Sequence, residues 1–131
     1  MHMRSKASTA VVIVALAAGC HSHKAPQPTS QDIAAAQQEA QREVAQARVE
    51  ATKDVKSAAK VAGMNSRELA QAKATASYDI AMAKADGDHQ VAVEKCLTLE
   101  ESTVQACKAR ADADYDTAKA SAKARRLARQ Q

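Results

Sequence analysis

An eleven-residue repeat runs through most of the chain after Pro28. Its blocks begin with Asp or Glu, carry Ile, Val or Leu in the second place, and carry alanine in the fifth and ninth places, with one glycine as the exception. The blocks are 32–42, 43–53, 54–64, 68–78 and 79–89. At about 100° per residue, places two, five and nine lie on one face of an α-helix. The repeat therefore predicts long helices, each with a narrow apolar face.

Composition limits how these helices can pack. Leu, Ile and Val make up about 12% of residues 20–131, against roughly 20% or more in chains with a packed core, and Trp and Phe are absent. Alanine favours helix strongly but buries little area. An eleven-residue period gives an almost straight seam. We therefore expect an all-α fold of long Ala-rich helices without a large core. A helix lying on a membrane surface is the alternative, but it would need bulky apolar side chains.

Capping signals divide the helical region. Thr29, three residues before Asp32, is typical of a helix start, and predicts a first helix over 30–63. Gly63 is typical of a helix end. Asn65, three residues before a glutamate, is typical of the next start. The three extra residues between the repeat blocks coincide with this break.

The first twenty residues have the pattern of an export signal. Arg4 and Lys6 precede an apolar stretch over 9–18, which is too short to span a bilayer. The following "LAAGC" resembles the lipobox of bacterial lipoproteins, although its leucine stands four places before the cysteine instead of three. The resemblance implies a signal peptide of residues 1–19 and a lipid on the sulfur of Cys20. A plain secretory signal with a free cysteine is the alternative.

A short tether is expected between the lipid and the helices. Residues 20–29 hold two prolines and no large apolar side chain. A metal site at Cys20, His21 and His23 is not expected, because an acylated sulfur is no thiolate ligand. His21 stands where enteric lipoproteins retained at the inner membrane carry Asp. The resemblance therefore implies the outer membrane, with the protein facing the periplasm.

Cys96 and Cys107 are the remaining cysteines. In one straight helix their Cα atoms would be about 16 Å apart, while a disulfide tolerates about 7 Å. In an exported protein, where disulfides persist, a bridge therefore requires the chain to turn between them. We predict a disulfide-linked helical hairpin over 64–129 that turns at about 97–103. Two free thiols are the alternative.

Two finer expectations follow from this hairpin. Ser102 or Thr103 is the expected N-cap of its second helix. If the turn is centred between the cysteines, Tyr115 lies opposite Gly87 and Asp88. The missing side chain at Gly87 would then make room for the tyrosine ring.

The stretch Ser77–Ala124 resembles a group of small exported proteobacterial proteins. The resemblance rests on Glu94-Lys95-Cys96, with a second cysteine eleven residues later, inside Ala/Lys-rich helices. His89 stands where members often carry Tyr. The resemblance implies the hairpin topology and the compartment, but no activity.

Basic residues gather at the end of the chain, where 117–131 holds five cations and no acid. They are Lys119, Lys123, Arg125, Arg126 and Arg129. A solvated helix end, with cations favourably placed near the helix dipole, is the favoured interpretation of this segment. The alternative is a basic tail that contacts an anionic lipid or lipopolysaccharide. Nucleic acid is not an expected partner, because export and the near balance of charge elsewhere disfavour it.

No arrangement of residues indicates catalysis. The sequence has no evident nucleophile–base pair, metal cluster or phosphate-binding loop, so no catalytic residue, metal or cofactor is expected. We expect a lipid-anchored, non-catalytic structural or interaction protein of the cell envelope, binding envelope proteins or copies of itself as a homo-oligomer. The alternative is a stress protectant, because Ala/Lys/Glu eleven-residue repeats resemble late-embryogenesis-abundant proteins. A fixed disulfide hairpin favours the first.

Overall fold

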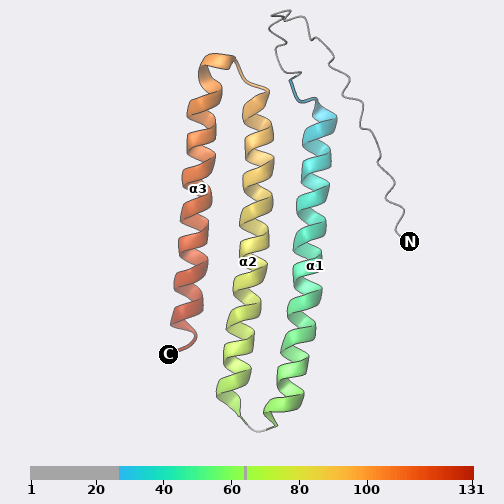
Figure 1. Cartoon of the computed structure of the whole chain (residues 1–131), viewed down its shortest axis with the longest axis vertical. Coiled ribbons are helices and arrows are strands. Elements are labelled where there is room, and N and C mark those ends of the chain that lie inside the picture. The colour runs from blue at the N-terminus through green and yellow to red at the C-terminus, as the bar shows by residue number, and fades with distance from the viewer. Residues whose placement is uncertain (1–26, 64) are drawn as a thin grey trace, which may run out of the picture.

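The part of the chain that the structure describes consists of three long helices. The computed structural model describes residues 27–63 and 65–131, so the predicted signal peptide 1–19 and Cys20 lie outside the described residues. The helices are α1 (Ser30–Ala62), α2 (Ser66–Leu97) and α3 (Glu101–Ala128), and no strand occurs among the residues described. The all-α prediction is confirmed. Figure 1 shows the helices side by side, with α2 in the middle and each neighbour antiparallel to it.

The capping signals of the sequence lie at the start of α1 and on both sides of the turn between α1 and α2. At the start of α1 the backbone N–H of Thr29 donates to the Asp32 carboxylate at 2.6 Å, and the Asp32 N–H donates to the Thr29 hydroxyl at 3.3 Å. The backbone hydrogen bond from Thr29 lowers the pKa of Asp32, and the side-chain bond adds to this. Gly63 ends α1 with a φ of 51°, a conformation that favours glycine. Asn65 caps α2 by accepting from the N–H of Arg67 at 3.2 Å.

The prediction for the start of α3 is wrong. The turn occupies Thr98–Glu100, inside the expected range, but Glu100 is the N-cap residue in place of Ser102 or Thr103. The hydroxyl and the N–H of Thr103 both donate to the Glu100 carbonyl oxygen at 2.8 Å. Thr103 therefore already belongs to the first helical turn, and its hydroxyl does not serve as a cap acceptor.

The repeat forms the seam between α1 and α2. Ala36 and Ala51 are buried in α1, and Ala76 and Gly87 are buried in α2. A Cβ added to Gly87 would lie 2.6 Å from the Cβ of Ala40. Gly87 is thus the point of close approach between α1 and α2.

A second seam of the same period joins α2 to α3. In α2, Ala74, Ala85 and Cys96 are buried at intervals of eleven residues. Ala111 and Ala122 are buried in α3 at the same interval. The α3 helix contacts α2 but not α1.

The angle between the two seams around α2 explains why the described helices lie in a single layer. The buried residues of the α2–α3 seam lie two positions before those of the α1–α2 seam, as Ala74 does before Ala76 and Ala85 before Gly87. Two residues correspond to about 200° around a helix. Neighbours packed on these seams must therefore lie on opposite sides of α2. A closed bundle would need the seams much closer together.

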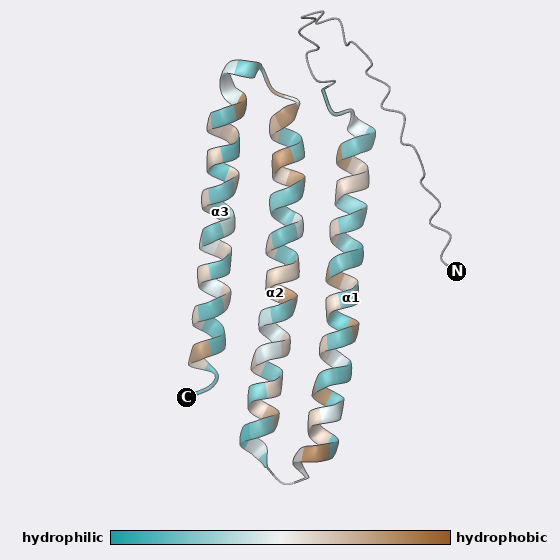
Figure 2. Cartoon of the chain, in the orientation of Figure 1, coloured by the Kyte–Doolittle hydropathy of each residue, from teal (hydrophilic) through white to brown (hydrophobic). Residues whose placement is uncertain are grey.

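Little apolar surface is buried in this layer. Among the described residues the buried apolar side chains are all Ala or Cys, and no polar side chain is buried. Figure 2 shows short apolar segments separated by hydrophilic ones along each helix. Among residues 27–63 and 65–131, no helix has the length and hydropathy needed to cross a membrane.

Candidate functional site

The predicted disulfide is formed. Cys96, in the last turn of α2, is bonded to Cys107 in α3, with their Cα atoms 5.5 Å apart. Cys96 is fully buried. The bond joins the two helices close to their turn, so it fixes the register of the α2–α3 seam.

A polar cluster lies next along this seam. The Tyr115 hydroxyl donates to the Asp86 carboxylate, and the Tyr115 ring stacks on His89 with 4.7 Å between centroids. His89 Nε2 lies 2.7 Å from an oxygen of Asp112 on α3. The hydrogen bond to Asp86 raises the pKa of Tyr115 above its usual value, and burial of the ring adds to this. The cluster joins α2 to α3 through polar contacts.

The expected role of Gly87 is therefore wrong. Tyr115 lies at the predicted level of α2, beside Asp86 and His89. Gly87 instead faces Ala40 of α1, on the opposite side of α2. The space at Gly87 admits a neighbouring backbone, and the tyrosine ring packs on the α3 side.

Three of the five predicted basic residues meet in one hollow between α2 and α3. Arg129 Nη1 donates to the Ser77 hydroxyl at 2.9 Å, and the Arg126 guanidinium lies 5.1 Å from the centroid of the Tyr78 ring. Arg125 lines the same hollow, whose volume is about 300 Å³. We call this site the arginine hollow. Its other lining residues are Ala74, Ile80, Ala81, Lys84 and Ala122.

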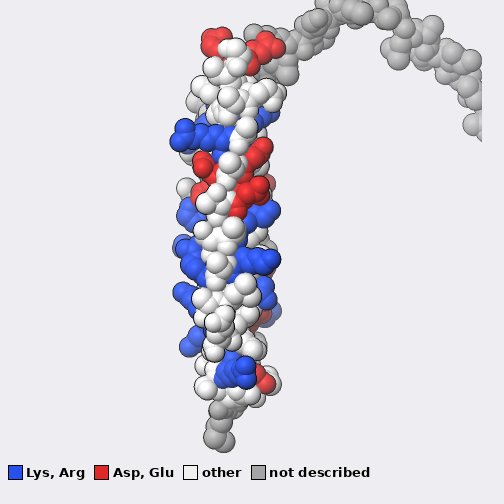
Figure 3. Space-filling model, turned by 90° about the vertical axis from the view of Figure 1, so that its left-hand side faces the viewer, with Lys and Arg blue, Asp and Glu red and all other residues white. Residues whose placement is uncertain are grey.

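The other two predicted residues lie elsewhere. Lys119 is 4.6 Å from the centroid of the Tyr115 ring and 3.9 Å from an oxygen of Asp116. Lys123 is exposed and does not line the hollow. Figure 3 shows the edge formed by α3, with acidic side chains at the α2–α3 turn and again farther down, and with mostly basic side chains below these, toward the C-terminus.

Sequence reasoning did not identify Ser77, Tyr78 and Lys84 as part of this site. The disulfide could have located these residues, because it pairs position 96 with position 107 and so sets the register between the two helices. The same antiparallel register places Tyr78 opposite Arg125. Tyr78 and Ser77 therefore fall beside the basic segment once the turn is known.

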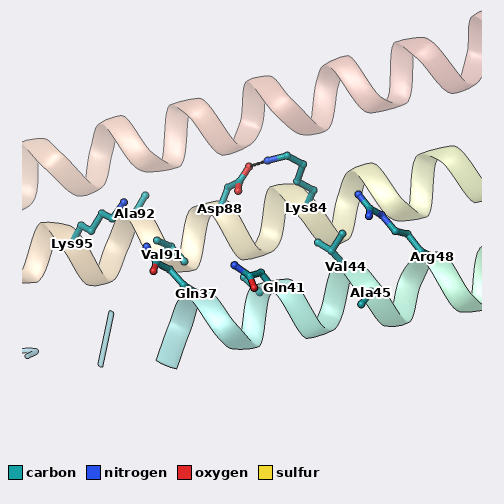
Figure 4. A pocket seen from close by; sticks show the side chains of 11 residues that line it. Gln37, Gln41, Val44, Ala45, Arg48, Lys84, Asp88, Val91, Ala92 and Lys95 are labelled. Atoms are coloured by element: carbon teal, nitrogen blue, oxygen red, sulfur yellow. Dashed lines mark hydrogen bonds and ion pairs between the residues drawn. The ribbon is translucent and has the colours of Figure 1, made fainter. Parts of the chain in front are cut away.

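A wider groove lies between α1 and α2, with a volume of about 800 Å³ (Figure 4). Val44 of α1 and Val91 of α2 line it among polar residues. Lys84 reaches Asp88 at 2.5 Å across one helical turn. Figure 4 shows that α3 contributes none of the labelled side chains. Lys84 also lines the arginine hollow, so both depressions open on the same broad face of the layer.

No cluster of potential metal ligands occurs in the part of the chain that the structure describes. Comparison of the chain with known protein families, characterised proteins and solved structures finds no match.

Proposed function

We propose that the chain is a lipid-anchored structural or interaction protein of the bacterial cell envelope, without catalytic activity. The observation that carries this proposal is the Cys96–Cys107 disulfide, together with the lipobox-like segment that ends at Cys20. Disulfides of this kind persist in oxidising compartments such as the periplasm. A disulfide thus agrees with the compartment that the export signal implies.

The shape of the molecule supports an interaction role. A single layer of three helices presents two broad faces, and α1 and α3 leave both faces of α2 partly open. Such a layer exposes more surface for its mass than a closed bundle does. The outer membrane is the proposed location, and envelope proteins, anionic lipid or a second copy of the chain are the proposed partners.

The test is the mass of the protein extracted from membranes, measured with and without reduction before alkylation. We expect a chain that begins at an acylated Cys20, with Cys96 and Cys107 modified by the alkylating reagent only after reduction. The Cys20→Ala variant is the control, and it should lack the acyl mass while Cys96 and Cys107 are still modified only after reduction. An unprocessed chain with free thiols would overturn both the anchor and the compartment.

A further inference from the structure

The arginine hollow is a concentration of positive charge without a counter-charge. Among the described residues, Arg125, Arg126 and Arg129 make no ion pair, and no Asp or Glu lines the hollow. Three guanidinium groups within five residues of one helix repel each other. An anion bound between them would remove that repulsion. Arginine also presents a planar fork of donors that fits phosphate oxygens.

Two of these arginines are held in place by α2. The Ser77 hydroxyl donates to the Lys73 carbonyl oxygen at 2.8 Å, which fixes its oxygen as the acceptor for Arg129. The ring of Tyr78 supports Arg126 from one side. Positioned guanidinium groups lose less conformational entropy on binding than free surface side chains do. The arrangement is therefore more than a solvated helix end.

The floor of the hollow is apolar. Ala74 and Ala122 are buried beneath it, and Ile80 and Ala81 complete it. An anion held by the arginines would therefore lie next to hydrocarbon surface. This combination suits a phosphate carried on an apolar molecule better than a free inorganic ion.

We propose that the arginine hollow binds the phosphate of an anionic membrane lipid. The adjoining groove on the same face is also basic, because Arg48, Lys84 and Lys95 line it. The one carboxylate lining that groove is Asp88, which is paired with Lys84. The layer thus binds the membrane with this face, and the hollow is its specific contact.

The position of the hollow is compatible with a lipid anchor at Cys20 in the same membrane. This point rests on the proposed function. Gly87 packs at the level of Ala40, so Tyr78, nine residues before it in α2, lies at about the level of Val49 in α1. This level is about 28 Å from the start of α1 at 1.5 Å per residue. The ten residues 20–29 reach at most about 33–36 Å when fully extended. The acylated cysteine and the hollow can therefore meet one surface.

The test uses the chain from residue 20 onward, which is the mature form under the proposed function, carrying Cys20→Ser and oxidised at Cys96 and Cys107. Neither an acyl chain nor the apolar stretch 9–18 then contributes to binding. Binding is measured by co-sedimentation with phosphatidylcholine vesicles, with and without phosphatidylglycerol. We expect R125Q/R126Q/R129Q to weaken binding to the anionic vesicles by about tenfold or more. The matched control is K53Q/K56Q/K60Q, which removes the same charge from a second basic hollow that is lined by α1 residues alone. We expect it to weaken binding less than about threefold.

Two further measurements distinguish a site from diffuse attraction. Ser77→Asp keeps all three arginines but places a carboxylate beside them, and we expect it to weaken vesicle binding as much as the arginine variant does. Inorganic phosphate, added at constant ionic strength, should not displace the protein from anionic vesicles. Equal losses in the two triple variants, full binding by Ser77→Asp, or displacement by phosphate would overturn the proposal. None of these outcomes depends on whether Cys20 is acylated in the cell.

Discussion

Gly87 shows how far one residue governs the spacing of two helices. Gly→Ala in an exposed helix stabilises it by about 1 kcal/mol. At Gly87 the added Cβ would lie 2.6 Å from the Cβ of Ala40, and overpacking of this kind costs about 1–3 kcal/mol. We therefore predict that Gly87→Ala lowers the free energy of unfolding by about 1 kcal/mol. Urea denaturation followed by circular dichroism measures this change.

A double variant provides the control for Gly87. Ala40→Gly combined with Gly87→Ala moves the methyl group from one helix to the other. Its unfolding free energy should exceed the sum expected from the two single variants, because the clash is relieved. If Gly87→Ala stabilised the protein as it would at an exposed site, the close approach of α1 and α2 would be contradicted.

Tyr115 gives a prediction for alkaline pH. Its hydrogen bond to Asp86 raises its pKa above the ordinary value of 10.0, because the neutral phenol is the donor. The resulting stabilisation is complete below pH 10.0 and is lost as the pH rises through the folded-state pKa. We expect phenolate absorbance to show a titration step above 10.0 that disappears in Tyr115→Phe and persists in Tyr78→Phe. If the step moves to the ordinary tyrosine pKa in Asp86→Asn, the hydrogen bond to Asp86 is the cause of the shift. An unchanged step would contradict that assignment.

Among the helices, α2 carries the information that determines the architecture. The sequence repeat identified one seam through Ala76 and Gly87, and capping signals at Thr29 and Asn65 located two helix starts. The second seam could also have been found, because Ala74, Ala85 and Cys96 are spaced by eleven residues. This spacing places Gly87 outside the α2–α3 seam, which is why Gly87 faces Ala40 and not Tyr115.

Other features could not be predicted from local sequence. The start of α3 depends on how tightly the chain turns, and both Ser102 and Thr103 have good capping chemistry. The turn closes within three residues, so both fall inside the helix. The arginine hollow depends on the register between α2 and α3, which the disulfide fixes.

The disulfide should matter most to α3, since α2 is the only one of the described helices that α3 contacts. A loop of this size stabilises by roughly 3 kcal/mol in the chain-entropy model, and the Ala-based seam itself buries little area. We predict that Cys96→Ser with Cys107→Ser speeds amide hydrogen exchange throughout α3, with a smaller change along α1. Reductant should reproduce this effect in the native chain and have none on the double variant. Unchanged exchange in α3 after reduction would mean that the seam alone holds it.

The three described helices form a row of pairwise contacts without a common hydrophobic core. Among the three helices that the structure describes, α1 contacts only α2 and α3 contacts only α2, so the stability of this part of the chain comes from two separate interfaces. Repeat proteins with this nearest-neighbour organisation remain folded through the sum of weak contacts. The layer is therefore open to association on both faces, and its two interfaces can be weakened independently.

The two proposed classes of function differ at this scale. An envelope protein with a fixed hairpin should be helical by itself. A protectant similar to late-embryogenesis-abundant proteins is instead disordered until it is dried or bound to a membrane. We predict that the oxidised chain gives a helical circular dichroism spectrum in dilute buffer without vesicles, and that heating removes the signal cooperatively. The disulfide-free double variant is the control, and it should melt at a lower temperature with a similar spectrum when cold. A coil spectrum that turns helical only on drying or with vesicles would contradict a preformed layer and favour the protectant. A coil spectrum would mean that the two seams are too weak to offset the conformational entropy lost when three long helices form.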